Sequence, residues 1–421
     1  MYSLRRFGIK LGLEVIKNIL NDLGNPQDTF SSIHIAGTNG KGSVASTLAT
    51  ILHCAGFNVG LYTSPHLIRF NERVRINGEM VTDAEIVESY KAVKQARFGD
   101  REPTFFEYTT AMAFYEFGRK NVDWAVIETG MGGRLDATNI LSPKVSIITN
   151  ISMEHQMYLG NTIKDITFEK AGIIKPKTPV VAGVRQKEGK DVLKRIADGN
   201  AAKMFQFKTD FNVRRNATGG FTYFGIDHVW RGLKTGLLGN HQTDNAALAL
   251  CACELLMRGG INNSKGQITL PQIKRGLEHN IWPGRLQTLS TSPFILVDGA
   301  HNLAAIRNLK TFLLENLGGR DLTLVVGILD DKSYKPMLKH LLPLCSRVII
   351  TRPKIDRSLA PEALYPVAKQ MIPDVRIIPD VPEAVKTAIE AASTGGAVCI
   401  AGSLYLVGET MEAIEKGEVN I

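Results

Sequence analysis

The sequence has little cysteine, no long apolar run and no block of basic residues, and each shortage excludes a class of protein. Five cysteines among 421 residues, mostly inside apolar stretches, argue against a disulfide framework and for reduced, buried thiols. No run approaches the roughly 18 apolar residues of a membrane-spanning helix, and the first residues show no apolar signal core. We therefore expect a cytoplasmic protein without a membrane partner.

Charge and aromatic content limit the choice of partners. Lysine plus arginine number 50 and aspartate plus glutamate 41, which gives a formal net charge of +9 that no segment concentrates. Aromatic residues make up only 7% of the chain, few for a surface that stacks nucleic-acid bases. A mild basic excess suits anionic small molecules as well as nucleic acid, so charge alone does not decide between them.

Short apolar strands alternate with amphipathic helices along most of the chain, and this pattern predicts parallel sheets covered by helices. In the first part we expect strands over residues 32–36, 57–62, 124–128 and 145–149, and helices over 43–55 and 245–257. Residues 205–230 change to short alternating segments, which predict an antiparallel hairpin appended to the sheet. The fold class is therefore α/β.

A second βα series begins after a polar stretch at residues 288–293. Strand candidates recur at intervals typical of one βα unit, starting at Ile295, Leu322, Arg347, Val375 and Ala397. We therefore predict two domains: a phosphate-loop, parallel-sheet domain over residues 1–290 and a smaller, Rossmann-like α/β domain over residues 291–421.

The strongest local motif is a glycine-rich turn between an expected strand and an expected helix, Gly37-Thr38-Asn39-Gly40-Lys41-Gly42-Ser43. Glycines let backbone N–H groups converge on phosphate oxygens, the helix N-terminus adds positive potential, and Lys41 can reach the terminal phosphates. The run departs from the strict phosphate-loop pattern, because Ile35 stands where its first glycine would be. Nucleotide binding is the prediction, and a plain glycine turn with an exposed lysine is the alternative.

Two candidate metal ligands follow consecutive expected strands. Glu128 ends one strand, and His155 follows the next. Alone, Glu128 would be a solvated strand end and His155 a structural histidine. Because the carboxyl ends of parallel strands open onto the same crevice, the pair is more informative than either residue, and a carboxylate there can help to hold Mg²⁺ beside phosphates.

Three further positions carry weaker signals. Lys170 ends a short expected helix and would by default be a surface lysine. Asp298 and His301 lie in the first strand-to-helix turn of the second domain, where ligands of open α/β sheets gather, and Arg285 precedes that domain. These residues would meet the phosphate loop only if the active site lay between the two domains.

Taken in order, these motifs resemble one family closely. The chain is similar to the folylpolyglutamate synthases and the bifunctional dihydrofolate synthase/folylpolyglutamate synthases of the Mur ligase superfamily. The similarity runs almost end to end and rests on residues 34–43 (HIAGTNGKGS), 62–67 (YTSPHL), 69–73 (RFNER), 169–175 (EKAGIIK), 298–302 (DGAHN) and 402–409 (GSLYLVGE).

The resemblance implies a role for each matching position. It implies ATP binding by Thr38, Asn39, Gly40, Lys41, Gly42, Ser43, Asn245, Arg285 and Asp298, and magnesium binding by Ser64, Glu128 and His155. Lys170 stands where the family carries a carbamylated lysine, which would add a carboxylate-like metal ligand. Lys41, Lys170 and His301 are thus the implied catalytic residues. The segment before Asn245 matches more loosely, since Asn240 stands where the family often has arginine.

The implied reaction is ATP-dependent formation of an amide through an acyl phosphate. The resemblance implies Mg²⁺, leaves K⁺ open, and implies L-glutamate, dihydropteroate and tetrahydrofolate as substrates of a monomer with no nucleic-acid partner. Phe105 and Phe106 match a segment that lies near the pterin in bifunctional members, although paired phenylalanines are otherwise core residues. We expect the bifunctional enzyme, and a synthase limited to polyglutamylation is the alternative.

Two more distant alternatives remain. A cell-wall precursor ligase of the same superfamily usually has an additional N-terminal substrate domain, for which the position of the phosphate loop leaves no room. A nucleic-acid-dependent phosphate-loop ATPase would be expected to show a concentrated basic face, and the sequence has no such block.

Overall fold

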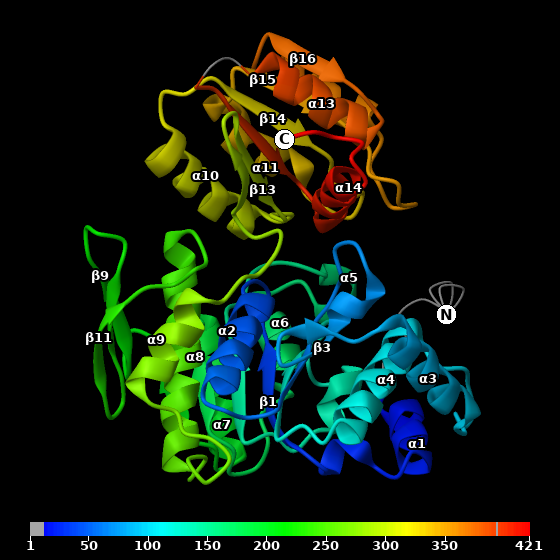
Figure 1. The fold of residues 1–421 in the computed structure, drawn as a ribbon, viewed down its shortest axis with the longest axis vertical. Coiled ribbons are helices and arrows are strands. Elements are labelled where there is room, and N and C mark those ends of the chain that lie inside the picture. Colours follow the sequence, from blue (N-terminus) through cyan, green and yellow to red (C-terminus); the bar gives the residue numbers. More distant parts are fainter. Residues whose placement is uncertain (1–11, 393–394) are drawn as a thin grey trace. The chain divides into compact units, whose positions relative to one another are not determined.

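The computed structural model describes residues 12–392 and 395–421, and residues 1–11, where no signal core is expected, lie outside it. The chain forms two compact units, and the first comprises residues up to His66, Phe70–Gly236 and Gln242–Ile281. The second comprises Leu67–Arg69, Leu237–His241 and the residues from Trp282 onward (Figure 1). No helix in the described ranges is long and apolar enough to cross a membrane.

Residues 282–290, which the sequence assigned to the first domain, group with the second unit. The Gly299 amide donates to the Gly284 carbonyl at 2.8 Å, and the Leu286 amide donates to the Asp298 carboxylate at 2.8 Å. Backbone pairing therefore joins this segment to the second sheet.

The first unit is built on an eight-stranded sheet in the order β4-β3-β2-β5-β1-β6-β7-β8. All its pairs are parallel except β2 with β3 and β3 with β4. The strands are β1 (Ser31–Ala36), β2 (Val59–Tyr62), β3 (Val74–Ile76), β4 (Glu79–Met80), β5 (Trp124–Glu128), β6 (Val145–Ile148), β7 (Val180–Ala182) and β8 (Met204–Gln206). β1 lies between β5 and β6, so the expected α/β fold and the neighbourhood of these strand ends are confirmed.

Helices cover this sheet because their apolar faces pack on alternating strand residues. Ala125 and Ile127 of β5 lie in one core cluster with Phe114 and Phe117 of α4. The helices are α1 (Glu14–Asp22), α2 (Lys41–Cys54), α3 (Asp83–Gln95), α4 (Phe105–Arg119), α5 (Gln156–Leu159), α6 (Ile163–Ala171), α7 (Lys187–Gly199), α8 (Asn240–Arg258) and α9 (Leu270–Glu278). α2 begins at Lys41, two residues before the expected start, because the glycine turn ends at Gly40.

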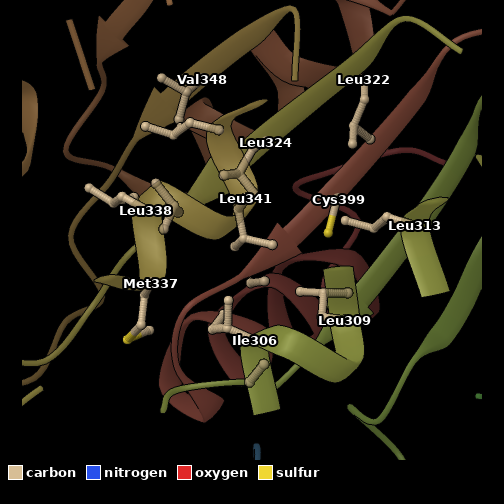
Figure 2. Packing of buried hydrophobic residues seen from close by; sticks show 14 of the residues in the cluster. Ile306, Leu309, Leu313, Leu322, Leu324, Met337, Leu338, Leu341, Val348 and Cys399 are labelled. Atoms are coloured by element: carbon tan, nitrogen blue, oxygen red, sulfur yellow. The ribbon is translucent and has the colours of Figure 1, made fainter. Parts of the chain in front are cut away.

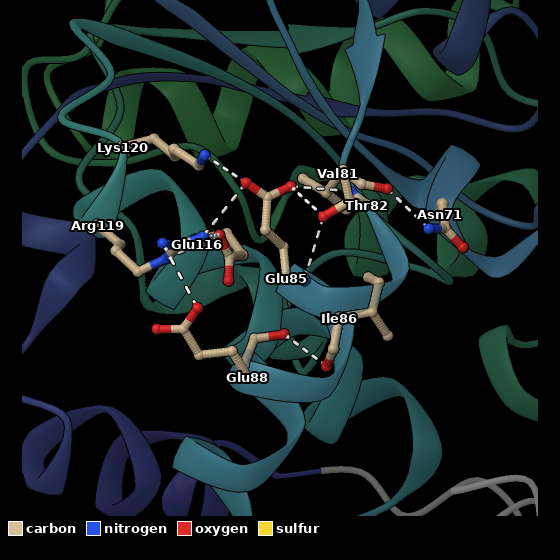
Figure 3. Close-up of polar contacts among 10 residues, drawn as sticks. Asn71, Val81, Thr82, Glu85, Ile86, Glu88, Glu116, Arg119 and Lys120 are labelled. Carbon is tan, nitrogen blue, oxygen red and sulfur yellow. Dashed lines mark hydrogen bonds and ion pairs between the residues drawn. The ribbon is translucent and has the colours of Figure 1, made fainter.

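Helices α3 and α4 are joined by a network of ion pairs (Figure 3). Thr82 and Thr104 cap the two helices through reciprocal capping boxes. Glu85 of α3 accepts from Lys120 and lies 3.4 Å from Arg119, which also pairs with Glu116 at 2.8 Å. The network fixes α3 on the C-terminal end of α4, the end opposite to Phe105 and Phe106.

The expected hairpin over residues 205–230 is wrong in its extent. β8 joins the main sheet, and a separate antiparallel sheet of three strands follows, with β9 (Asn212–Arg215), β10 (Phe221–Phe224) and β11 (Val229–Leu233) in the order β11-β10-β9. This small sheet lies against α9 (Figure 1). Buried Glu254 of α8 also holds it, accepting from the Tyr223 hydroxyl at 2.7 Å and from the Ile226, Asp227 and His228 amides.

The second unit has a six-stranded sheet in the order β12-β13-β17-β14-β15-β16, in which only β12 is antiparallel. Its strands are β12 (Gln287–Thr291), β13 (Phe294–Asp298), β14 (Leu322–Val326), β15 (Arg347–Ile350), β16 (Asp374–Ile377) and β17 (Ala397–Ala401). Its helices are α10 (Leu303–Leu317), α11 (Tyr334–Leu341), α12 (Pro361–Lys369), α13 (Val381–Ala391) and α14 (Leu404–Glu415). The expected polar connector at 288–293 is instead mostly strand β12, which is half-buried at the sheet edge.

Apolar side chains from α10, α11 and the strands fill one face of this sheet (Figure 2). Ile306, Leu309 and Leu313 of α10 lie in the same buried cluster as Leu338 of α11 and Cys399 of β17. All five cysteines of the chain are free, with Cys251, Cys253 and Cys399 buried and the other two partly buried. Burial raises the pKa of each of the five thiols.

Candidate active site

The glycine-rich turn brings its backbone unusually close to two neighbouring side chains. Gly37 has φ +150° and Gly40 has φ +82°. A Cβ on Gly37 would lie 1.9 Å from Oγ1 of Thr149, and a Cβ on Gly40 would lie 2.5 Å from Oδ1 of Asn245. Glycine is therefore required at both positions by contact as well as by backbone conformation.

Polar residues at the end of β6 fix the shape of this turn. The Asn39 amide donates to Oδ1 of Asn150 at 3.0 Å, and Nδ2 of Asn150 donates to the Asn39 carbonyl at 2.8 Å. Oγ1 of Thr149 donates to the same carbonyl at 2.7 Å. The sequence analysis gave no role to Thr149 or Asn150, although their place at a strand end beside β1 was a usable signal.

Two lysines converge on the carbonyl of Gly37. Nζ of Lys41 lies 3.2 Å from this oxygen and 3.9 Å from Oε1 of Glu128, and Nζ of Lys170 donates to the same carbonyl at 2.8 Å. Lys170 is only 4% exposed, so its expected surface position is wrong. Burial, and then the charge of Lys41, lower the pKa of Lys170 to about 7, so much of this amine is uncharged near neutral pH.

The structure brings Ser64 and Glu128 together beside these lysines. Glu128 is buried and accepts from the Ser64 amide at 3.2 Å. His155 is exposed and begins α5, and its loop is tied to the phosphate loop because the Ser152 amide donates to Oγ1 of Thr38 at 3.0 Å. Nothing described places His155 against Glu128.

These residues fit a hard divalent cation. In the described ranges no cluster of three or more His, Cys, Asp or Glu side chains could hold a metal, so any site must also use other donors. Ser64 and Glu128 supply oxygen donors, and the buried hydroxyls of Thr129 and Ser152 have no hydrogen-bond partner. Mg²⁺ prefers oxygen ligands and needs few from protein, because substrate phosphates and water complete its shell.

A buried carboxylate that the sequence analysis missed lies behind this site. Asp136 is fully buried, burial raises its pKa, and it accepts from the Met131 amide at 2.9 Å and from Oγ1 of Thr138. Oγ1 of Thr138 also lies 2.8 Å from Nε2 of His34, whose pKa burial lowers to about 3. This chain of contacts joins β1 to the loop that follows β5.

Phe105 and Phe106 form the first turn of α4 and face different neighbours. Phe106 packs against Gly130, where a Cβ would lie 2.5 Å from its ring, and lies 6.1 Å from the ring of Tyr62. Phe105 lies beneath the Arg73 guanidinium, 5.3 Å away. Both rings are partly buried. They therefore line a surface beside the loop that follows Glu128, and they are not fully enclosed in the hydrophobic core.

A separate polar cluster lies in the second unit. Asp298 ends β13 and accepts from the Leu286 and Ala300 amides at 2.8 and 2.9 Å. Burial raises the pKa of Asp298, and the neighbouring Arg285 opposes this shift. Arg285 lies 3.4 Å from the Gly299 carbonyl, and Nδ1 of His301 lies 2.8 Å from the same oxygen. The structure therefore groups Asp298 and His301 as expected for one strand-to-helix turn, and it adds Arg285, which the sequence placed before the second domain.

The chain belongs to one class of protein, the Mur ligases. Residues 35–253 match the family described as the Mur ligase middle domain, and residues 284–404 match the family described as the Mur ligase, glutamate ligase domain. Within this class, the chain belongs to the folylpolyglutamate synthase/dihydrofolate synthase family.

Two curated relatives carry this assignment. The dihydrofolate synthase/folylpolyglutamate synthase of Bacillus subtilis is 34% identical over 97% of this chain and 96% of the relative. The folylpolyglutamate synthase of Lacticaseibacillus casei is 35% identical over 96% of this chain and 94% of the relative. The resemblance inferred from the motifs is confirmed.

Solved structures agree with this assignment. E. coli FolC in complex with DHPP and ADP has a TM-score of 0.89 and 29% identity, covering 97% of this chain and 94% of that chain. The bifunctional enzyme from Yersinia pestis with AMPPNP and Mn has a TM-score of 0.87 and 29% identity, covering 98% and 97%. A further bifunctional structure, with Mn, AMPPNP and L-glutamate bound, has a TM-score of 0.87 and 30% identity over the same shares.

Proposed function

We propose that this chain is an ATP-dependent ligase that adds L-glutamate both to dihydropteroate and to tetrahydrofolates. The observation that carries the proposal is the convergence of Lys41 and Lys170 on the Gly37 carbonyl, beside buried Glu128. This arrangement places Lys41 and the amide groups of the glycine turn at the N-terminus of α2, where nucleotide phosphates bind in phosphate-loop proteins.

The chemistry begins with activation of a carboxylate. A carboxylate is a poor acyl donor, so its oxygen first attacks the γ-phosphorus of ATP and releases ADP. Lys41 and the backbone N–H groups of the glycine turn offset the charge on the transferred phosphoryl group. The amine of L-glutamate, having lost its extra proton, then attacks the acyl phosphate, and phosphate leaves as the amide forms.

We propose that Ser64, Glu128 and His155 hold Mg²⁺ for this step. When bound, the cation neutralises charge on the phosphate oxygens and orients them. The Mn in related structures supports a divalent metal, and the oxygen donors here fit Mg²⁺.

We further propose that Lys170 is carbamylated. The uncharged amine nitrogen attacks the carbon of CO₂, an N–C bond forms and one proton leaves the nitrogen, so a neutral amine becomes an anionic carbamate. The observed burial supports this, because a pKa near 7 leaves much of the amine uncharged and nucleophilic. The product supplies carboxylate-like oxygens close to Glu128 and Ser64.

The proposed pterin surface supports the use of dihydropteroate. Phe105 and Phe106 are partly buried at the start of α4, and Arg73 is held in place by its Nε donating to Nδ1 of His66 at 2.8 Å. Such rings can stack on a flat heterocycle. Relatives named for one activity and relatives named for both occur at similar identity, so identity does not separate the two alternatives.

We propose that Asn245, Arg285 and Asp298 contact the nucleotide and that His301 lies near the transferred phosphate and the incoming amino acid. Their polar groups and the bound ligands of the related structures support these roles. We also propose a monomeric, cytoplasmic enzyme, a location that the five free thiols support because such thiols suit a reducing compartment.

A two-substrate assay tests the proposal. Purified protein with ATP, Mg²⁺ and L-glutamate should release ADP when dihydropteroate or tetrahydrofolate is added, and little ADP without either. ADP release at the same rate with and without the acceptors would contradict the proposed ligase activity. A response to tetrahydrofolate alone limits the enzyme to polyglutamylation.

A further inference from the structure

An aspartate near the start of α8, Asp244, is held between two arginines from other elements. Oδ1 of Asp244 accepts from Nη2 of Arg215 at 2.5 Å, and Oδ2 accepts from Nη2 of Arg185 at 2.5 Å. Nε of Arg215 also donates to Oγ1 of Thr243 at 2.5 Å. The planar fork of Arg215 thus binds two consecutive residues of one helical turn, a geometry that a lysine cannot reproduce.

The residue that follows Asp244 reaches the phosphate loop. Asn245 is buried, its Nδ2 donates to Oε1 of Gln242 at 2.8 Å, and its Oδ1 lies where a Cβ on Gly40 would be only 2.5 Å away. A shift of α8 at Thr243 and Asp244 therefore changes the position of Asn245 relative to the glycine turn.

The small antiparallel sheet holds Arg215 beside α8. Arg215 ends β9 of the small sheet, and that sheet is fixed further along α8 by Glu254, which binds Tyr223 and the amides of residues 226–228. The sheet thus contacts α8 at two places, and Arg215 supplies the contact nearest to Asn245. The side chain of Asp244 is only 20% exposed, so solvent weakens this ion pair less than one on an open surface.

We propose that Arg215 is a positioning residue for the nucleotide, acting through Asp244 and Asn245, and that this gives the small antiparallel sheet a function. The inference rests on the proposed contact of Asn245 with the nucleotide. It predicts that loss of the Arg215 fork weakens nucleotide binding while the chemical step, once the nucleotide is bound, proceeds at its usual rate.

The adjacent residue provides a matched control. Arg214 is exposed and lies over the ring of Phe224, 5.6 Å away. We expect Arg215→Ala to raise the Kd for ADP, measured by calorimetry, and the KM for ATP, each roughly tenfold, with kcat little changed. Arg215→Lys, which keeps the charge and loses the fork, should fall in between, and Arg214→Ala should match the parent chain.

A double-variant comparison separates positioning from a general loss of stability. If Arg215 acts through Asn245, then Asn245→Ala weakens ADP binding and adding Arg215→Ala to it weakens binding little further. Should Arg215→Ala fail to fold, Arg215→Lys and Asp244→Asn carry the same comparison.

Unchanged ADP affinity in folded Arg215 variants overturns the inference, as does full additivity with Asn245→Ala. Unchanged affinity in Asn245→Ala overturns both the inference and the proposed nucleotide contact of Asn245. The two-substrate assay decides separately whether the chain is a folate ligase, so failure of that function is distinguishable.

Discussion

At the scale of single residues, the position of Lys170 has the largest chemical consequence. It lies 2.8 Å from the Gly37 carbonyl, buried beside Lys41, although its place at the end of a short helix predicted a surface side chain. The sequence could not show this burial, because it arises against the glycine turn after β1, which lies far earlier in the chain. Only the family motif around Lys170 pointed to its importance.

Replacing Lys170 with alanine removes the amine that we propose to be carbamylated. We expect kcat to fall roughly a hundredfold, because a charged group that helps to hold the metal beside the phosphates is lost. Acetate or formate should restore part of the rate in a steady-state ADP assay by supplying the missing oxygens. Lys164→Ala, on the exposed face of the same helix, should be near normal. Full activity of Lys170→Ala without added acid would leave Lys170 a structural role only.

Gly40 offers a second prediction. Gly40→Ala should raise the KM for ATP at least about tenfold, because the new Cβ would lie 2.5 Å from Oδ1 of Asn245 and displace the turn. Gly24→Ala is a matched control, since Gly24 has a similar φ of +78° with no atom near its Cβ position. Both variants should lose about 1 kcal/mol of stability from backbone strain. Equal nucleotide kinetics in the two would contradict the proposed close approach.

At the scale of elements, the α3–α4 network makes stability depend on pH. The hydrogen bond from Lys120, with that from the Thr82 amide, lowers the pKa of Glu85 from its ordinary 4.5 to about 2. Since the folded pKa is the lower one, Glu85 stabilises the fold above about pH 4.5, and this contribution is lost as the pH falls toward 2.

We therefore expect Glu85→Gln to lower the free energy of unfolding by about 2 kcal/mol near neutral pH. The difference from the parent chain should shrink below the ordinary pKa of the carboxyl and vanish at strongly acid pH. Urea unfolding at several pH values measures it. Glu88→Gln, whose side chain is 52% exposed, should show a smaller effect. A pH-independent difference for Glu85→Gln would contradict this electrostatic account.

Elements that bury a continuous apolar run were predictable from the sequence. β5, β14 and β17 lie where the sequence placed strands, because buried strands of a parallel sheet are nearly continuous apolar runs. β12 was missed because Gln287–Thr291 is polar and half-buried, and its pairing with β13 is a tertiary contact. The three-stranded sheet was mistaken for a hairpin because alternation within each strand does not reveal how many strands pair.

At the scale of the whole molecule, the restart of the βα pattern showed that there is a second unit. It could not show that Leu67–Arg69 and Leu237–His241 belong to that unit, because these short segments are assigned by contacts alone. The grouping of Asp298 with His301 was predictable because both residues lie in one strand-to-helix turn, whereas Arg285 joins them through the tertiary backbone contacts of its neighbours Gly284 and Leu286.

Nucleotide binding should stabilise the intact chain. AMPPNP with Mg²⁺ at about a hundredfold excess over its Kd should add about 2.7 kcal/mol, if it binds only the folded protein. Differential scanning fluorimetry should show a higher Tm, and chelation of the metal should reduce the shift. Lys41→Ala should abolish it, whereas exposed Lys144→Ala should keep it. An equal Tm shift in both variants would show that Lys41 does not bind the phosphates.

The free cysteines can report when each unit of the molecule unfolds. Alkylating reagents and peroxides attack the thiolate, and burial keeps these five thiols protonated in the folded chain. Cys251 and Cys253 lie in α8 of the first unit, and Cys399 lies in β17 of the second. Pulsed alkylation followed by peptide mass spectrometry therefore times the opening of each unit separately, without any introduced label.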